Sequence, residues 1–284
     1  MKLIIGFIIL FSAMLGGFIL DEGHPLALWQ PTELLVILGC AAGAFVIANP
    51  VKVIKGAISG TINAVKPNAF NKVAHLELLM CLYGVAAKVR KSGLMSLEED
   101  LDAPQKSELF KKYPKLTKSK PMMSFFADNM RLLILGAMKP HDLDMMLESE
   151  LEHYAQELEK PSEAINRMAD GMPGFGIVAA VMGIVVTMQF IGGDPKMLGS
   201  HVAAALVGTF CGILFSYGVF GPISVAISYQ NKIEVGYMHC LKIFLVNLAA
   251  GIAPQITIEV VRKSISTDLR PTFEELENKI KGKK

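Results

Sequence analysis

The side chains able to do chemistry here are six histidines, four cysteines and a set of carboxylates outside the most apolar stretches. The histidines form no H-E-x-x-H motif and no triad-like cluster, so no general base is paired with a nucleophile. No cysteine belongs to a C-x-x-C pair or lies at zinc-ligand spacing from a histidine. We therefore expect no catalytic residues, no metal site and no cofactor, and we expect that the chain is not an enzyme. The cysteines, read as structural, are Cys40, Cys81, Cys211 and Cys240.

Binding of nucleotides or nucleic acid is also excluded by the residue pattern. The segment Pro173-Gly-Phe-Gly176 lacks the G-x-x-x-x-G-K-[ST] spacing that cradles phosphates, and it opens an apolar stretch rather than following a strand. The net charge of +2 provides no basic field that would attract nucleic acid. The remaining chemistry to consider is the passage of ions across a lipid bilayer.

Four long stretches contain no Asp, Glu, Lys or Arg: residues 3–20, 34–51, 172–193 and 202–231. A helix of 18 residues is about 27 Å long, close to the ~30 Å thickness of the hydrocarbon core. Because backbone polar groups in lipid must be satisfied within the segment, each stretch is expected to be a helix. The predicted fold class is all-α, an integral membrane protein with four transmembrane helices in two hairpins. A signal peptide is the alternative for the first stretch, but no A-x-A cleavage site follows it.

The charged segments predict how the chain crosses the membrane. Residues 52–171 hold 17 Lys and Arg, and residues 232–284 hold 9, whereas residues 21–33 hold none. Basic residues near span ends stay in the cytoplasm, so both termini and the long loop are predicted to be cytoplasmic. The predicted domains are hairpin 1 at 1–51, a cytoplasmic helical domain at 52–171, hairpin 2 at 172–231 and a cytoplasmic helical tail at 232–284. Hairpin 2 is predicted to contain spans at 172–193 and 202–222, and the helix of the second span is expected to extend into the cytoplasm.

The charged segments are expected to be helical. Apolar residues recur at helical spacing over 143–158, and residues 75–92 and 122–138 are further helix candidates. Ser96-Leu-Glu-Glu99 and Thr272-Phe-Glu-Glu275 fit the capping box that starts a helix. Two segments are assigned differently: 111–121 is expected to be a loop, and 243–258 is expected to be a buried or interfacial helix, ended or kinked by Pro254, rather than a fifth span.

The four apolar stretches offer no titrating group for carrying protons, although such groups usually mark a proton or cation path. If this chain conducts ions, we expect a partner to supply the carboxylate. The stretches are rich in small residues instead, and Gly208-x-x-x-Gly212 is a small-xxx-small pattern that lets helices approach closely. These helices are therefore expected to pack tightly, around a partner as well as around one another.

Several segments resemble the MotA family of the MotA/TolQ/ExbB proton channel superfamily. The third span is similar in Ala169-Asp-Gly-Met-Pro-Gly-Phe-Gly-Ile-Val-Ala-Ala180-Val-Met-Gly183, and the fourth in Val207-Gly-Thr-Phe-Cys-Gly-Ile-Leu214 followed by Gly221-Pro222. The segment Ala87-Lys-Val-Arg90-Lys-Ser-Gly-Leu-Met-Ser-Leu-Glu98 resembles the part of the family that faces the rotor. The short motifs Gln30-Pro-Thr-Glu33 and Arg270-Pro271 also fit, so the resemblance runs over nearly the whole chain.

This resemblance implies a flagellar stator subunit in the bacterial inner membrane. It implies a homopentamer around a dimer of a MotB-like protein, which has one span with an aspartate and a peptidoglycan-binding domain. Ion flow at the interface would drive rotation of the pentamer against a FliG-like rotor ring. An energiser of the ExbB/TolQ class, acting on an outer-membrane process, is the alternative, but that class usually has three spans. A self-sufficient transporter would need a charged or broken-helix site at the membrane midplane.

The resemblance also implies roles for particular residues. Pro173 and Pro222 would couple ion passage to cytoplasmic motion, because proline frees a backbone carbonyl and bends the helix axis. Without the resemblance, Pro173 would simply begin a helix and Pro222 end one. Arg90 and Glu98 would meet charged rotor residues, whereas by themselves they are ordinary solvated charges.

Two further positions bear on the coupling ion. By the same resemblance Thr209 would line the ion path, and Ala180 would lie opposite the partner's aspartate. Sodium-driven relatives tend to place threonine at the position of Ala180, where a hydroxyl can replace a water of hydration. Because alanine supplies no oxygen, we predict that protons are the coupling ion.

Overall fold

In the computed structural model, residues 2–136, 138–192 and 194–281 are described, and within these ranges the chain forms helices and no strand. They fold as two compact units. We call Met1–Pro67 with Leu158–Gln230 the spanning unit, and Asn68–Glu157 with Asn231–Lys284 the charged unit. The units are described separately below.

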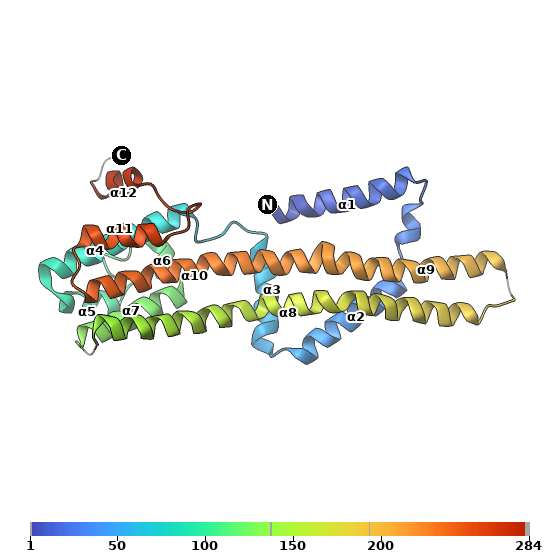
Figure 1. Ribbon diagram of the computed structural model, residues 1–284, viewed down its shortest axis with the longest axis horizontal. Helices are drawn as coiled ribbons and strands as arrows, with labels where there is room; N and C mark the ends of the chain where they lie inside the picture. The colour runs from blue at the N-terminus through green and yellow to red at the C-terminus, as the bar shows by residue number, and fades with distance from the viewer. Residues whose placement is uncertain (1, 137, 193, 282–284) are drawn as a thin grey trace. The chain divides into compact units, whose positions relative to one another are not determined.

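The spanning unit contains the helices long and apolar enough to cross a membrane (Figure 1). Four such segments occur: Lys2–Leu20, Pro25–Ala48, the apolar part of Pro140–Met188 and that of Pro195–Ala249. The prediction of an all-α protein with four spans is thereby confirmed. The helices are α1 (Lys2–Leu20), η1 (Pro25–Leu28), α2 (Pro31–Ala48), α3 (Val51–Ala64), the second part of α8 (Pro140–Met188), α9 (Pro195–Ile213), the π-helical η3 (Leu214–Phe220) and the start of α10 (Gly221–Ala249).

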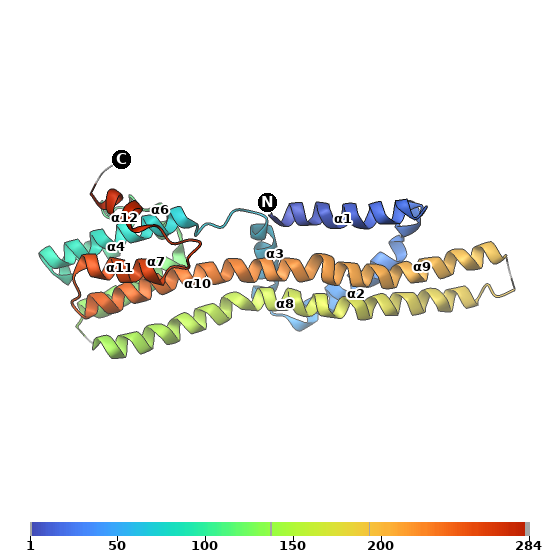
Figure 2. The same cartoon turned by 45° about the horizontal axis from the view of Figure 1, so that its top comes forward.

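Three of these helices meet in one small apolar cluster. Ile37 of α2, Ala179 of α8 and Cys211 of α9 are all buried there. Figures 1 and 2 both show α9 running beside the second part of α8, and α2 packs against α9. The uniformly apolar sequences that predicted membrane helices thus also supply a shared core.

The charged unit has a larger core of its own. Leu143, Leu147 and Leu151 are buried in it, which confirms the helical spacing read from the sequence. Phe110 and Phe126 pack edge to face at 5.9 Å between ring centroids, and such aromatic pairs add to the stabilisation from burial. The helices are α4 (Lys72–Ser92), η2 (Leu94–Leu97), α5 (Glu98–Asp102), α6 (Pro114–Lys118), α7 (Lys120–Ile134), the first part of α8, the rest of α10, α11 (Pro254–Ser264) and α12 (Phe273–Ile280).

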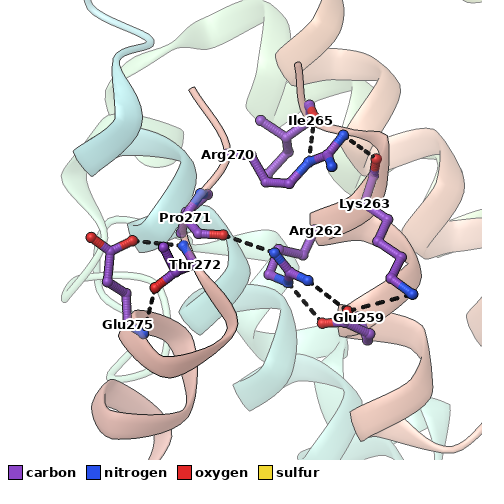
Figure 3. A network of polar contacts seen from close by, with 8 residues as sticks. All are labelled: Glu259, Arg262, Lys263, Ile265, Arg270, Pro271, Thr272 and Glu275. Carbon is purple, nitrogen blue, oxygen red and sulfur yellow. Dashed lines mark hydrogen bonds and ion pairs between the residues drawn. The ribbon is translucent and has the colours of Figure 1, made fainter. Parts of the chain in front are cut away.

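A polar network fastens the C-terminal segment between α11 and α12 (Figure 3). Arg262 makes a bidentate pair with Glu259 at 2.7 and 2.8 Å and also donates to the carbonyl of Pro271. Arg270 donates to the carbonyls of Ile265 and Lys263. The guanidinium groups therefore satisfy carbonyls at the end of α11 and in the irregular segment that follows it.

The structure confirms one predicted capping box and contradicts the other. Thr272 and Glu275 form the reciprocal bonds of a capping box at the start of α12. Ser96 instead lies inside η2 and donates its hydroxyl to the carbonyl of Gly93, so it caps no helix. The pattern failed there because Gly93, at φ +79°, starts a short 3-10 turn before α5.

Two segment predictions were wrong in detail. Residues 111–121, expected as a loop, contain α6, whose first residue is Pro114. Residues 243–258 form no single helix, because α10 continues to Ala249 and Pro254 then begins α11 at a position that proline favours. Phe244 and Leu245 are fully buried in the core of the charged unit, which explains the apolar character of this segment.

Candidate functional site

The apolar parts of α8 and α9 touch backbone to backbone along a seam of small residues. A Cβ placed on Gly212 would lie 2.8 Å from the Cα of Gly176 and 2.9 Å from the carbonyl oxygen of Met172. A Cβ on Gly176 would lie 3.0 Å from the carbonyl oxygen of Gly208. The close approach predicted from Gly208-x-x-x-Gly212 is therefore confirmed, and the glycines are what permit it.

Ala180 and Thr209 both lie on this seam, and both are half-buried. A Cβ on Gly208 would lie 3.5 Å from the amide nitrogen of Ala180, and one on Gly176 would lie 3.4 Å from the Cα of Thr209. The structure thus brings together two residues that are separated in sequence and that were predicted for an ion path.

A further residue on the seam, the acidic Glu33, was not predicted for the ion path from the sequence, where it ends the segment 21–33 before the second uncharged stretch. It lies in the first turn of α2, which begins at Pro31, and it is only 9% exposed. A Cβ on Gly208 would lie 3.1 Å from its Oε2, and a Cβ on Gly183 would lie 3.5 Å from its Oε1. The uncharged stretch 34–51 still holds no acid, but α2 begins before that stretch, at Pro31, and therefore includes Glu33. The signal available in the sequence was Pro31, because proline favours the first helical position and so draws Glu33 into the helix.

The two prolines lie within continuous helical segments. Pro173 is inside α8, so the interpretation that it merely begins a helix is wrong. Pro222 follows the π-helical η3 and is the second residue of α10, so it does not end a helix. Gly221 donates its amide to the carbonyl of Ser216, five residues back, which is the π-type bond. Both prolines therefore interrupt the hydrogen-bond ladder of a helix that continues past them.

Arg90 and Glu98 lie in the charged unit and are exposed, Arg90 in the last turn of α4 and Glu98 at the first residue of α5. Among the described residues neither has an ion-pair partner. The segment between them is tied down by Asp100, which pairs with Lys88 at 2.5 Å and accepts a bond from the Ser107 hydroxyl at 2.6 Å. The two charges are thus presented to solvent on an anchored turn.

Arg90 also lines a pocket of about 310 Å³ with apolar walls from Val89, Ile252 and Pro254. An arginine beside an apolar hollow can bind a carboxylate while a neighbouring apolar side chain fills the hollow. No such hollow was predicted from the sequence, because α4 and the turn between α10 and α11 are far apart in the chain.

The described residues contain no group of three or more His, Cys, Asp or Glu that could hold a metal ion. Arg90 and Glu98 belong to the charged unit, and Pro173, Ala180, Thr209 and Pro222 belong to the spanning unit. The chemistry available to the seam is transfer or stabilisation of charge at Glu33, and that available to the exposed charges is recognition of a charged surface.

Comparisons with known proteins cover the whole chain. Residues 4–93 match the N-terminal region of motility protein A, and residues 117–239 match the MotA/TolQ/ExbB proton channel family. Motility protein A of Salmonella typhimurium is 35% identical over 282 residues, which cover 99% of this chain and 96% of that protein. Chemotaxis protein LafT of Vibrio parahaemolyticus is 36% identical over 277 residues, 98% and 97% of the two chains. The solved structure of C. jejuni MotAB shares the fold, with a TM-score of 0.77 at 19% identity over 96% of this chain and 98% of that one.

Proposed function

The chain belongs to the MotA/TolQ/ExbB proton channel family, and on that premise we propose that it is a stator subunit of the bacterial flagellar motor. With a MotB-like partner it forms a proton channel and converts proton flow into torque on the rotor. The observation that carries this proposal is identity of about a third to motility proteins over nearly the full length of both chains. The ExbB/TolQ alternative is not favoured, because the N-terminal residues 4–93 match motility protein A specifically.

The partner enters the proposal for a physical reason. The seam between α8 and α9 offers small side chains and one carboxyl, with no alternating series of acids and bases along the spans. A continuous relay needs several titrating groups, so a MotB-like aspartate beside Ala180 completes the path. We propose a homopentamer around the partner, with Thr209 lining the path and protons as the coupling ion.

The mechanical part of the proposal uses the helix interruptions. Pro173 and Pro222 leave carbonyls without their usual helical partners, so the axis there can bend at low cost when a nearby charge changes. Arg90 and Glu98 are exposed and unpaired within the described chain, which suits an alternating electrostatic contact with a FliG-like rotor ring. The apolar hollow beside Arg90 adds room for an apolar rotor side chain.

Location follows from family and helices together. The chain is a multi-pass protein of the inner membrane. We propose that both termini and residues 52–171 are cytoplasmic, since that loop holds 17 Lys and Arg.

Deletion of the gene tests the function. Cells without this chain are expected to assemble normal flagellar filaments and yet fail to swim, and expression of the chain in trans should restore swimming. Deletion mutants that swim normally but fail in an outer-membrane uptake process would support the ExbB/TolQ alternative instead.

The coupling ion is tested by tethered-cell rotation. Rotation should persist at full speed when sodium is replaced by potassium, and it should collapse when a protonophore dissipates the proton gradient. Rotation that tracks the sodium concentration would refute the assignment drawn from Ala180.

A further inference from the structure

We propose that Glu33 is a proton-binding carboxyl of this chain's own, which takes up a proton at the outer end of the seam between α8 and α9. This goes beyond the channel described above, in which the partner supplies the acid, but it rests on the proposed function for the direction of proton movement. The ligand is the proton itself, exchanged with water on the side of the short loop that precedes α2.

The first argument is the position of the side chain. Glu33 is 9% exposed, in the first turn of α2, and its two carboxylate oxygens face different glycines of the neighbouring helices. Gly183 belongs to α8 and Gly208 to α9, so the carboxyl bridges the two helices that carry Ala180 and Thr209. A side chain on either glycine would occupy space against the carboxylate, so both glycines keep its site open.

The second argument is the lack of countercharge. Among the described residues the side chain of Glu33 has neither a hydrogen bond nor an ion pair. The same two glycine positions lie close to small apolar side chains, since a Cβ on Gly183 would be 3.0 Å from that of Ala205 and one on Gly208 would be 3.4 Å from that of Ala179. The adjoining η1 consists of proline, leucine and alanine. In the part of the chain that the structure describes, no basic side chain is paired with Glu33 to balance its charge when it is ionised.

The cost of burying a charge determines whether Glu33 carries a proton. A buried carboxylate without a cation or hydrogen-bond donors is costly, and such groups ordinarily become neutral by binding a proton. The backbone amides of the first helical turn are free donors and favour some negative charge at a helix N-terminus. A carboxyl under these opposed influences is suited to exchanging a proton.

Infrared spectroscopy on the assembled complex tests the proposal. The chain would be purified with its MotB-like partner, and difference spectra would be recorded between acidic and alkaline buffer. The expected result is a carbonyl band of a protonated carboxylic acid that disappears in Glu33→Gln and shifts in Glu33→Asp. Glu22→Gln, which changes an exposed acid in the preceding outer loop, should leave the band unchanged.

The same variants separate this inference from the proposed function. If Glu33→Gln retains every band of the wild type, Glu33 is not protonated and the inference fails, while swimming of the wild type still supports the stator function. If the wild type restores no swimming but the Glu33 band is present, the function fails and the carboxyl assignment stands. A Glu33→Gln band loss accompanied by reduced proton flux at unchanged protein level supports both.

Discussion

A half-buried carboxylate, Asp100, holds the turn that separates Arg90 from Glu98. Its side chain is 14% exposed and bonded to Lys88 and Ser107. Burial opposes ionisation of Asp100, but hydrogen bonds from Lys88 and Ser107 outweigh it, so the pKa of Asp100 is lowered from its ordinary value of 3.8. The two charges that we propose to contact the rotor therefore depend on a residue that itself faces inward.

Asp100→Asn is expected to lower the free energy of unfolding by about 1 kcal/mol, because Lys88 loses its charged partner and is itself partly exposed. The stabilisation by Asp100 is present above pH 3.8 and is lost as the pH falls through its lowered pKa. Thermal unfolding of the purified protein in detergent measures both effects. Glu99→Gln is the matched control, since Glu99 is exposed; equal effects of the two variants would contradict the assignment.

His75 gives a pH dependence in a different range. Burial lowers its pKa below 6.5, although its bond to the carbonyl of Asn71 and the charge of Asp268 act in the opposite direction. The unfolded chain then binds more protons than the folded one as the pH falls below 6.5, so stability decreases there by at most about 1.4 kcal/mol per pH unit from this group. The melting temperature measured between pH 5 and 7.5 should depend less on pH in His75→Asn.

His239 contributes in the same direction, because burial and the neighbouring Lys242 lower its pKa. Some pH dependence of the melting temperature should therefore remain in His75→Asn, and it should decrease further when His239 is also replaced. If His75→Asn keeps the full pH dependence of the wild-type melting temperature, His75 is charged in the folded protein.

At the scale of helices, the close packing of α8 against α9 depends on glycines that leave no room for a larger side chain. In Gly212→Ala the new Cβ would meet backbone atoms of α8 at 2.8 and 2.9 Å, so one helix must move. Overpacking of this kind usually costs about 1–3 kcal/mol. We expect a lower melting temperature in detergent and weaker swimming.

Gly174→Ala is the matched control for the seam. Gly174 lies in α8, two residues before Gly176, which Gly212 of α9 approaches closely. A Cβ on Gly174 would meet nothing within 4 Å. Alanine favours helix over glycine, so this variant should be as stable as the wild type or slightly more so. Similar destabilisation by both variants would mean that the close packing at Gly212 does not explain the effect, because helix propensity favours alanine at both positions.

At the scale of the whole molecule, the two units differ in what surrounds them. The spanning helices expose many large apolar side chains, such as Ile8 and Ile9 of α1 at 61% and 63%, while the charged unit closes a core of its own. Exposed apolar faces of this extent require lipid or other protein copies around them. This pattern agrees with membrane insertion and with the proposed oligomer.

The direction of insertion can be measured with reporter fusions. Alkaline phosphatase, which is active only outside the cytoplasm, should be active when fused after Glu22 and inactive when fused after Ala103 or at the C-terminus. The reason is the concentration of Lys and Arg in residues 52–171 and 232–284. Activity of the fusion after Ala103 would place the long loop outside and overturn the proposed orientation.

The sequence by itself determined the four spans, the helical character of both units and the family. Each of these is a local property, because a membrane helix satisfies its backbone within its own segment, and burial of Leu143, Leu147 and Leu151 follows from helical spacing. The capping box at Thr272 is equally local.

Only the tertiary structure decided the place of Glu33, the seam around Gly208 and Gly212, and the hollow beside Arg90. These depend on which helices pack together, and that information is spread over residues far apart in the chain. Glu33 lies one position before an uncharged stretch, so sequence alone assigned it to water. Its burial arises because α2 starts at Pro31 and two glycines on other helices leave room for its carboxyl.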